Sequence, residues 1–288
     1  MFYMNGQFVE DLEAKISILD LGLVRGYGVF DYLRTYRGLP FHLKEHLLRL
    51  KYSGEYLGIH LPHSLEEIEK IIKRLLDQNG YLESSIKIIL TGGVSPDQIT
   101  PQETASLIIL IYPLASLPKE DYHLGIITMT TPLQRSLPTA KTLHYAPAIM
   151  ALQQGRYKNA KEILYLNANH EILEASTSNF FGFTKKGVLL TCDSEEILLG
   201  ITREIIIKLA KEHFPVELRA VNYAELNEIE ESFITSSNKE ILPVVQIDDQ
   251  LIGSGKIGPF TQKLMHLFYL YTSEGNWPDL NISRYKII

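Results

Sequence analysis

The sequence of 288 residues contains one cysteine, Cys192, so neither a disulfide framework nor a cysteine-rich zinc site is available. Cys192 ends the apolar run 188–192, and we expect a buried structural thiol there rather than a nucleophile. No apolar run approaches the roughly 18 residues that a membrane-spanning helix needs. The first residues also lack the basic and apolar regions of a secretory signal.

Basic residues are nowhere concentrated, and the net charge is −6, which argues against a nucleic-acid partner. Gly22, Gly26 and Gly28 have the wrong spacing for either glycine-rich nucleotide fingerprint. We therefore predict a cytoplasmic protein with no membrane or nucleic-acid partner and no metal site.

The chain is 45% hydrophobic and long enough to bury a sizeable core, which predicts two domains. Strand and helix patterns alternate unevenly, and this indicates a mixed α/β (α+β) protein. Residues 112–121 combine two prolines with a polar cluster, as linkers between domains often do. We expect a first domain over residues 1–118, a linker over 119–123 and a second domain over 124–288.

Local patterns predict the elements within these domains. Asn5-Gly6 suits a two-residue hairpin turn between strands 2–4 and 7–9, and Asn79-Gly80 suits the end of a helix. Apolar spacing predicts helices over residues 42–57, 65–76, 147–157, 202–214 and 259–271. Further strands are expected over residues 29–36, 86–90, 105–112, 124–129, 162–166, 179–183, 188–190, 216–220, 231–235 and 243–247.

Three separated features suit one kind of chemistry. Lys141 supplies an amine, Glu174 supplies a carboxylate, and a helix that opens at Gly200-Ile201-Thr202-Arg203 supplies backbone donors for a phosphate. An amine for a Schiff base, an anion for a pyridinium nitrogen and a phosphate site are what a protein needs to hold pyridoxal phosphate. The order of these parts, and the wording Glu-x-x-x-Ser-Asn-x-Phe that begins at Glu174, resemble the class IV (fold-type IV) aminotransferase family.

The resemblance implies roles that the residues alone leave open. From composition, Lys141 is a surface lysine before a helix, Glu174 is a loop carboxylate, and Tyr145 packs within a helix. The family makes Lys141 the catalytic Schiff-base lysine, which also moves a proton at the substrate. It places Glu174 against the pyridine nitrogen and a tyrosine near Tyr145 against the ring oxygen. His144 stands where many relatives have asparagine and receives no role, and Glu171 is read as a solvated charge in a turn.

The phosphate site is expected to come from three places. Ile201 and Thr202 offer backbone N–H groups at the start of a helix, where Thr202 also suits an ordinary N-cap. Ser236 and Ser237 match the second phosphate loop of the family. Arg49 matches the arginine of its His-x-x-Arg-Leu helix, which reaches the phosphate, although a lone arginine on such a helix is usually solvated.

The substrate pocket is less clearly marked. Phe30 and Arg34 resemble the branched-chain pattern, in which a phenylalanine and an arginine stand at these positions. The D-amino acid enzymes carry an arginine and a histidine after a Ser-Pro step to trap the carboxylate. Here Ser95-Pro96 is followed by Asp97-Gln98-Ile99, so that trap is missing and D-amino acid specificity is disfavoured.

Lys87 stands where branched-chain enzymes have an arginine, and a lysine there is reminiscent of aminodeoxychorismate lyase. The further arginine of that lyase is absent from residues 91–94. Lys87 is either a carboxylate receptor or an exposed strand lysine. The backbone N–H groups at Ser237 and Asn238 are the other candidate receptors for the substrate carboxylate.

The resemblance therefore implies an aminotransferase that uses pyridoxal 5′-phosphate. It would move an amino group between a branched-chain-like L-amino acid and a 2-oxo acid by a ping-pong mechanism. The alternatives are a 4-amino-4-deoxychorismate lyase, which releases pyruvate and 4-aminobenzoate, and a non-enzymatic cofactor-binding relative. The family also implies a small α/β domain, a larger pseudo-barrel domain and a homodimer.

Overall fold

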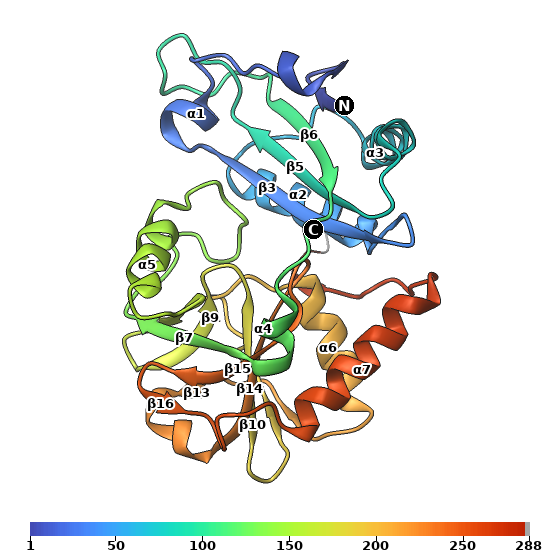
Figure 1. Cartoon of the computed structure of the whole chain (residues 1–288). Coiled ribbons are helices and arrows are strands. Elements are labelled where there is room, and N and C mark those ends of the chain that lie inside the picture. Colours follow the sequence, from blue (N-terminus) through green and yellow to red (C-terminus); the bar gives the residue numbers. More distant parts are fainter. Residues whose placement is uncertain (286–288) are drawn as a thin grey trace. The chain divides into compact units, whose positions relative to one another are not determined.

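A computed structural model describes residues 1–285, and the chain divides into two compact units (Figure 1). The first unit contains Met1–Ala115, Ala140–His144 and the chain from Gly275 onward, and the second contains Ser116–Thr139 and Tyr145–Glu274. This division differs from the expected one. Residues 119–123, expected as a linker, lie in helix α4 (Lys119–Leu124) of the second unit. Ala140–His144 belongs to the first unit because its backbone is hydrogen-bonded to a strand there.

The first unit is an antiparallel sheet with helices packed against it. Its strand order is β2-β1-β6-β5-β3-β4. The strands are β1 (Phe2–Met4), β2 (Gln7–Val9), β3 (Gly28–Tyr36), β4 (Leu39–Pro40), β5 (Ser84–Thr91) and β6 (Ser106–Pro113). The helices are α1 (Leu21–Arg25), α2 (Leu43–Tyr56) and α3 (Leu65–Asn79), with short 3-10 turns η1 (Asp11–Glu13) and η3 (Ser283–Tyr285).

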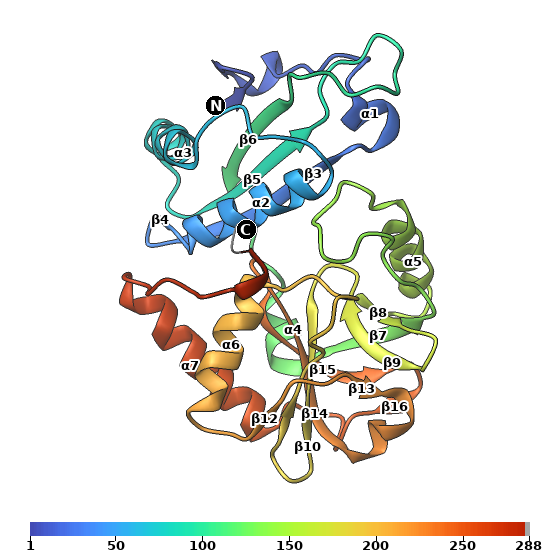
Figure 2. The ribbon, with the colours of Figure 1, turned by 180° about the vertical axis from the view of Figure 1, so that it is seen from behind.

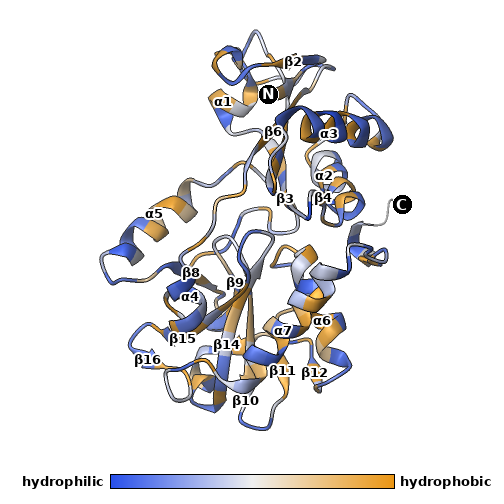
Figure 3. Cartoon of the chain, turned by 45° about the vertical axis from the view of Figure 1, so that its right-hand side comes forward, coloured by the Kyte–Doolittle hydropathy of each residue, from blue (hydrophilic) through white to orange (hydrophobic). Residues whose placement is uncertain are grey.

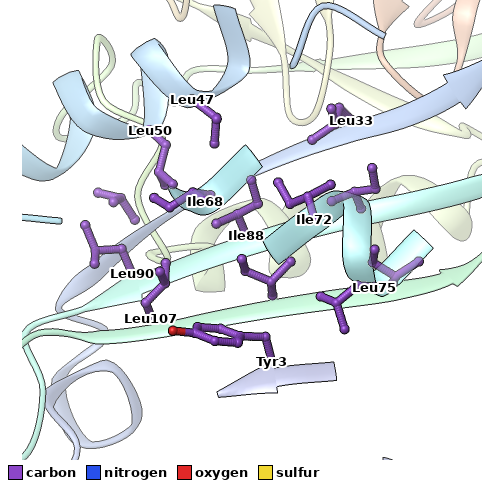
Figure 4. Packing of buried hydrophobic residues seen from close by; sticks show 14 of the residues in the cluster. Tyr3, Leu33, Leu47, Leu50, Ile68, Ile72, Leu75, Ile88, Leu90 and Leu107 are labelled. Carbon is purple, nitrogen blue, oxygen red and sulfur yellow. The ribbon is translucent and has the colours of Figure 1, made fainter. Parts of the chain in front are cut away.

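The core of this unit lies between the sheet and the helices α2 and α3. Figure 4 shows Leu50 of α2 and Ile72 of α3 with Ile88 of β5, and all three side chains are fully buried. The predicted ends are also present: Asn5 and Gly6 both have positive φ, and Gly80 ends α3 in the left-handed conformation. Figure 3 shows a largely hydrophilic surface along α3, which leaves one apolar side for the sheet.

A buried ion pair fastens α2 to β3. The Nε and Nη2 atoms of Arg49 each donate to an oxygen of Asp31 over 2.8 Å, and Nδ1 of His46 lies 2.6 Å from the same carboxylate. Burial alone would raise the pKa of Asp31, but the charge of Arg49 and the contact with His46 hold the pKa well below its usual range. Arg49 is buried, so the solvated arginine that its helix position also allowed is not what the structure shows.

The second unit is built on a sheet that closes on itself. Its strand order is β12-β11-β10-β14-β15-β7-β8-β9-β13, and β10 also pairs with β9, so β10, β14, β15, β7, β8 and β9 form a ring. This closed sheet confirms the expected pseudo-barrel. The strands are β7 (Ile126–Thr131), β8 (Glu162–Leu166), β9 (Glu171–Ala175), β10 (Asn179–Thr184), β11 (Leu189–Leu190), β12 (Val216–Glu217), β13 (Val221–Asn222), β14 (Ile229–Ser236), β15 (Glu240–Ile247) and β16 (Gln250–Leu251).

Helices and a 3-10 turn complete the second unit: α4, α5 (Ala146–Arg156), α6 (Ile201–Lys211), α7 (Pro259–Glu274) and η2 (Tyr223–Glu228). Figure 2 shows α6 and α7 side by side against the sheet. Cys192 is buried, as expected, and burial raises the pKa of its thiol. Glu171, expected in a turn, is instead the first residue of β9, where its carboxylate accepts a hydrogen bond from the Asn167 amide.

Within residues 1–285, no helix is both long enough and apolar enough to cross a membrane. In the same part of the chain, no three His, Cys, Asp or Glu side chains are grouped as metal ligands.

We predict that Asp31→Asn lowers the free energy of unfolding by about 3 kcal/mol near neutral pH, because it leaves the Arg49 guanidinium buried without its counterion. The pKa of Asp31 is lower in the folded chain than its value of about 3.9 in an unfolded chain. Its contribution is therefore complete above about pH 4 and is lost as the pH falls through the folded-state pKa. Urea unfolding should show the difference from wild type narrowing below about pH 4.

The matched control is Asp279→Asn, which removes the exposed partner of Lys44 in the same unit and should change stability little. An equal loss in the two variants would contradict the assigned role of the buried pair.

Candidate active site

Lys141 is placed by backbone contacts within the first unit. Its N–H donates to the Ser53 hydroxyl of α2 over 3.1 Å, and its carbonyl accepts from the N–H of Phe30 over 2.9 Å. On its other side, the N–H of Leu143 donates to the Gly28 carbonyl. The segment that carries Lys141 is therefore fixed alongside β3.

Two lysines contact the Phe30 ring. Nζ of Lys141 lies 4.7 Å from the centre of this ring, and Nζ of Lys87 lies 5.1 Å from it. Lys87 is half-buried on β5, opposite Tyr32 of β3. Arg34 lies on the same face of β3 as Phe30, because alternate residues of a strand share a face. Its guanidinium lies over the Tyr36 ring. The predicted substrate residues Phe30, Arg34 and Lys87 thus share one surface with Lys141.

Arg49 is oriented differently. It pairs with Asp31, which lies on the opposite face of β3 from Phe30 and Arg34. The pairing with Asp31 does not test the predicted contact between Arg49 and a phosphate, so that contact stays a prediction. The 3-10 turn η3 adds Tyr285, a buried residue whose hydroxyl oxygen accepts a hydrogen bond from the Arg49 guanidinium.

Glu174 lies at the seam where the barrel of the second unit closes. It is buried on β9, and its direct neighbour across the seam is Asn179 of β10. One carboxylate oxygen accepts from Nε of Arg135 over 2.8 Å. The other accepts from the N–H of Leu198 over 3.1 Å and from the Asn179 amide over 3.5 Å. These contacts fix the orientation of the carboxylate.

Arg135 is a residue that the sequence reasoning missed. It is the one basic residue between Glu120 and Lys141 apart from the histidine His123, and it stands shortly before the predicted catalytic lysine. This position, shortly before Lys141, was the feature of the sequence that could have marked Arg135 as a candidate site residue. Its pairing with Glu174 depends on the packing of two distant segments, which no local pattern reveals.

The phosphate-binding segments lie next to this seam. Helix α6 begins at Ile201, and its N-cap is Gly200, which has no side-chain cap; the reading of Thr202 as an N-cap is therefore wrong. The first N–H groups of a helix have no partner inside the helix, so this end can receive an anion. A Cβ atom on Gly200 would lie 2.2 Å from Oδ1 of Asn179, so only glycine lets α6 approach the seam this closely.

The hairpin of β14 and β15 adds the predicted second phosphate loop. Thr235 of β14 pairs with Asn179 of β10, and Ser236 pairs with Glu240, so the turn at 237–239 extends from the same edge of the barrel. The Ser236 hydroxyl donates to the Asn238 side chain over 2.9 Å. The Thr235 hydroxyl is buried and has no hydrogen-bond partner among the residues that the structure describes.

Tyr145 precedes α5 in the second unit, and its carbonyl accepts from the N–H of Ile149 over 2.9 Å. Burial, then the charges of Glu162 and Glu174, raise the pKa of the Tyr165 hydroxyl, and Tyr145 adds to the effect. Tyr145 and Glu174 therefore both lie close enough to Tyr165 to raise the pKa of its hydroxyl.

The candidate residues thus fall into two groups, one in each unit. The first unit carries an amine, a second lysine and an aromatic ring. The second carries a braced carboxylate, helix N–H groups and hydroxyls within adjoining strands and turns. A buried carboxylate beside the start of a helix and the buried Thr235 hydroxyl fits a ligand that has a basic ring nitrogen and a phosphate.

Comparison with known proteins agrees with this geometry. Residues 28–247 match the family model "Amino-transferase class IV". A protein of Methanocaldococcus jannaschii, whose assignment as a branched-chain-amino-acid aminotransferase is itself provisional, is 34% identical over 92% of this chain and 94% of its own. The D-alanine aminotransferase of Staphylococcus epidermidis is 30% identical over 93% of this chain and 96% of its own.

Solved structures show the same likeness. The branched-chain amino acid aminotransferase of Escherichia coli has a TM-score of 0.89 at 26% identity, over 96% of both chains. A second branched-chain amino acid aminotransferase, solved with pyridoxamine 5′-phosphate, has a TM-score of 0.87 at 28% identity, over 96% of this chain and 94% of that one. The enzyme of the archaeon Thermoproteus uzoniensis, solved with norvaline, has a TM-score of 0.84 at 27% identity, over 96% of this chain and 95% of its own. With the match to residues 28–247, these findings show that the chain belongs to the class IV aminotransferase family and is a transaminase acting on amino acids and 2-oxo acids.

Proposed function

We propose that this protein uses pyridoxal 5′-phosphate to transfer the amino group of a branched-chain-like L-amino acid to a 2-oxo acid by a ping-pong mechanism. The observation that carries the proposal is the buried Glu174 carboxylate, braced by Arg135 and the Leu198 N–H beside the start of α6. A carboxylate at this place suits the nitrogen of a pyridine ring.

The second unit supplies most of the proposed cofactor contacts. Glu174 would pair with the ring nitrogen, and Tyr145 would contact the ring oxygen. The phosphate is held by the N–H groups of Ile201 and Thr202 and by Ser236 and Ser237, with Arg49 of the first unit as a further cation. When bound, the cofactor withdraws electrons from the substrate Cα and carries the amino group between the two half-reactions.

Lys141 is the proposed catalytic residue. Its amine would form the covalent link to the cofactor and would move the proton at the substrate Cα. The Lys141 and Lys87 ammonium groups lie 4.7 and 5.1 Å from the centre of the Phe30 ring, which places this ring beside the proposed catalytic amine.

The proposed substrate preference rests on Phe30, Arg34 and Lys87. Phe30 offers an apolar surface for an aliphatic side chain, whereas Lys87 and Arg34 offer positive charge to a carboxylate. The backbone N–H groups at Ser237 and Asn238 take the substrate α-carboxylate. The missing arginine and histidine of the carboxylate trap favour the L-enantiomer. The aminotransferase relatives favour this function over the lyase.

We also propose a homodimer in the cytoplasm. Ile149 and Met150 of α5 are more than half exposed, and Figure 3 shows a hydrophobic stretch along this helix. An exposed apolar helix face of this kind suits an interface between two copies.

We predict that Glu174→Gln slows the first half-reaction about a hundredfold or more, because a neutral amide no longer holds a proton on the ring nitrogen. The measurement is the loss of visible absorption when leucine is added to the cofactor-loaded protein without an acceptor. Glu171→Gln is the matched control, since Glu171 lies on the same strand but contacts Asn167. Equal rates in wild type and Glu174→Gln would give the ring nitrogen another partner and overturn the proposal.

For Lys87→Met we expect the KM for glutamate to rise about tenfold or more with little change for leucine, because glutamate alone has a second carboxylate to bind a cation. Steady-state kinetics with both donors measure the difference. Lys51→Met, which removes an α2 lysine paired with Glu55, is the control. Unchanged kinetics for both donors would make Lys87 a plain strand lysine.

A further inference from the structure

Glu162 is a buried carboxylate that the proposed reaction does not use. It is 1% exposed at the start of β8, a strand that is buried along its whole length. A carboxylate in such a place is costly unless it is paired and hydrogen-bonded. We therefore expect a cation and hydrogen-bond donors of the second unit to contact the Glu162 carboxylate.

The compensation comes from Lys239 and from the segment that follows Glu174. Nζ of Lys239 lies 2.7 Å from one oxygen of Glu162, and the Thr177 hydroxyl donates to the same oxygen over 2.6 Å. The Ser176 hydroxyl donates to the other oxygen. Burial alone would raise the pKa of Glu162, but the Lys239 charge and these hydroxyls hold it below its usual value.

Lys239 also binds the serine-rich segment directly. Its ammonium donates to the hydroxyls of Thr177 and Ser178 as well as to Glu162. An ammonium has three N–H donors, so these three contacts use all of them. Lys239 is thereby committed to its protein partners and is not a free cation for a phosphate.

The two segments that Lys239 joins are both part of the proposed cofactor site. Lys239 ends the turn of the β14–β15 hairpin, directly after Ser236, Ser237 and Asn238, and its carbonyl accepts from the Tyr122 hydroxyl over 3.0 Å. Residues 176–178 connect Glu174 on β9 to Asn179 on β10, and the N–H of Ala175 donates to the Ser178 carbonyl over 2.7 Å.

We propose that Lys239 is a positioning residue that holds the phosphate turn at a fixed place relative to Glu174. This inference rests on the proposed function, since it assumes that the turn binds the cofactor phosphate. A rigid ligand with an anionic group at one end and a basic nitrogen at the other is bound well only if both receptors are held to a fraction of an ångström. Lys239 and Glu162 provide that constraint.

The test compares binding of pyridoxal 5′-phosphate and of pyridoxal, which lacks the phosphate, to the apo protein. We expect Lys239→Met to weaken binding of the phosphorylated form about tenfold and to leave pyridoxal unchanged, because only the former uses the turn. Lys185→Met is the control, as it removes the same charge from an exposed pair with Glu228 in the same unit. A general loss of structure would weaken both ligands equally and would overturn the inference.

Lys239→Met leaves the Glu162 carboxylate buried without a counterion, so a second test uses the double variant Glu162→Gln/Lys239→Met. Its melting temperature should recover toward wild type, while its affinity for pyridoxal 5′-phosphate should stay about tenfold weaker. Recovery of affinity together with stability would reduce Lys239 to a charge partner of Glu162 and overturn the inference.

These outcomes are distinct from a failure of the proposed function. Wild-type protein that shows no saturable binding of pyridoxal 5′-phosphate and no visible absorption would refute both proposals. Wild-type protein that binds normally, with Lys239→Met indistinguishable from it, would refute only the role of Lys239.

Discussion

The pairing of Glu174 with Asn179 is the contact on which the second unit depends. It joins β9 to β10 and so turns an open sheet into a closed ring. The same pairing sets a carboxylate at the seam, where Arg135 and the Leu198 N–H hold it. The backbone pairing that closes the barrel therefore also positions the carboxylate. The contacts with Arg135 and the Leu198 N–H compensate for the burial of this group.

The pairing of β9 with β10 also restricts which residue can stand at position 200. Gly200 lies so close to Asn179 that any side chain would displace the amide, and Asn179 in turn contacts Glu174. The start of α6, the seam and the end of the β14–β15 hairpin thus form a single packed region of the second unit. In the first unit, the buried pair of Asp31 and Arg49 fastens α2 to β3, the strand that carries Phe30.

Much of this could be predicted from sequence, where local patterns decide the outcome. Asn5-Gly6 predicted its hairpin because both residues tolerate positive φ, and the spacing of Ile68, Ile72 and Leu75 predicted α3. The pyridoxal phosphate motif identified the family because Lys141, Glu174 and the 200–203 helix start occur in a characteristic order.

The rest depends on contacts between distant residues. Strand β9 was missed because Glu171–Ala175 has two charged residues in five positions, and it becomes a strand only through its partners in the barrel. Ala140–His144 lies within residues 124–288, the range expected for the second domain. Its backbone is hydrogen-bonded to β3 of the first unit, so a boundary drawn from composition alone placed it in the wrong domain. Arg135 and Lys239 likewise acquire meaning only when the fold brings Glu174 and Glu162 to them.

The central claim is that one lysine, Lys141, carries the cofactor. Borohydride reduction of the protein loaded with pyridoxal 5′-phosphate, followed by peptide mass spectrometry, tests it most directly because reduction makes the covalent link permanent. A single phosphopyridoxyl group is expected, on Lys141. Modification of a different lysine, or none at all under saturating cofactor, would contradict it.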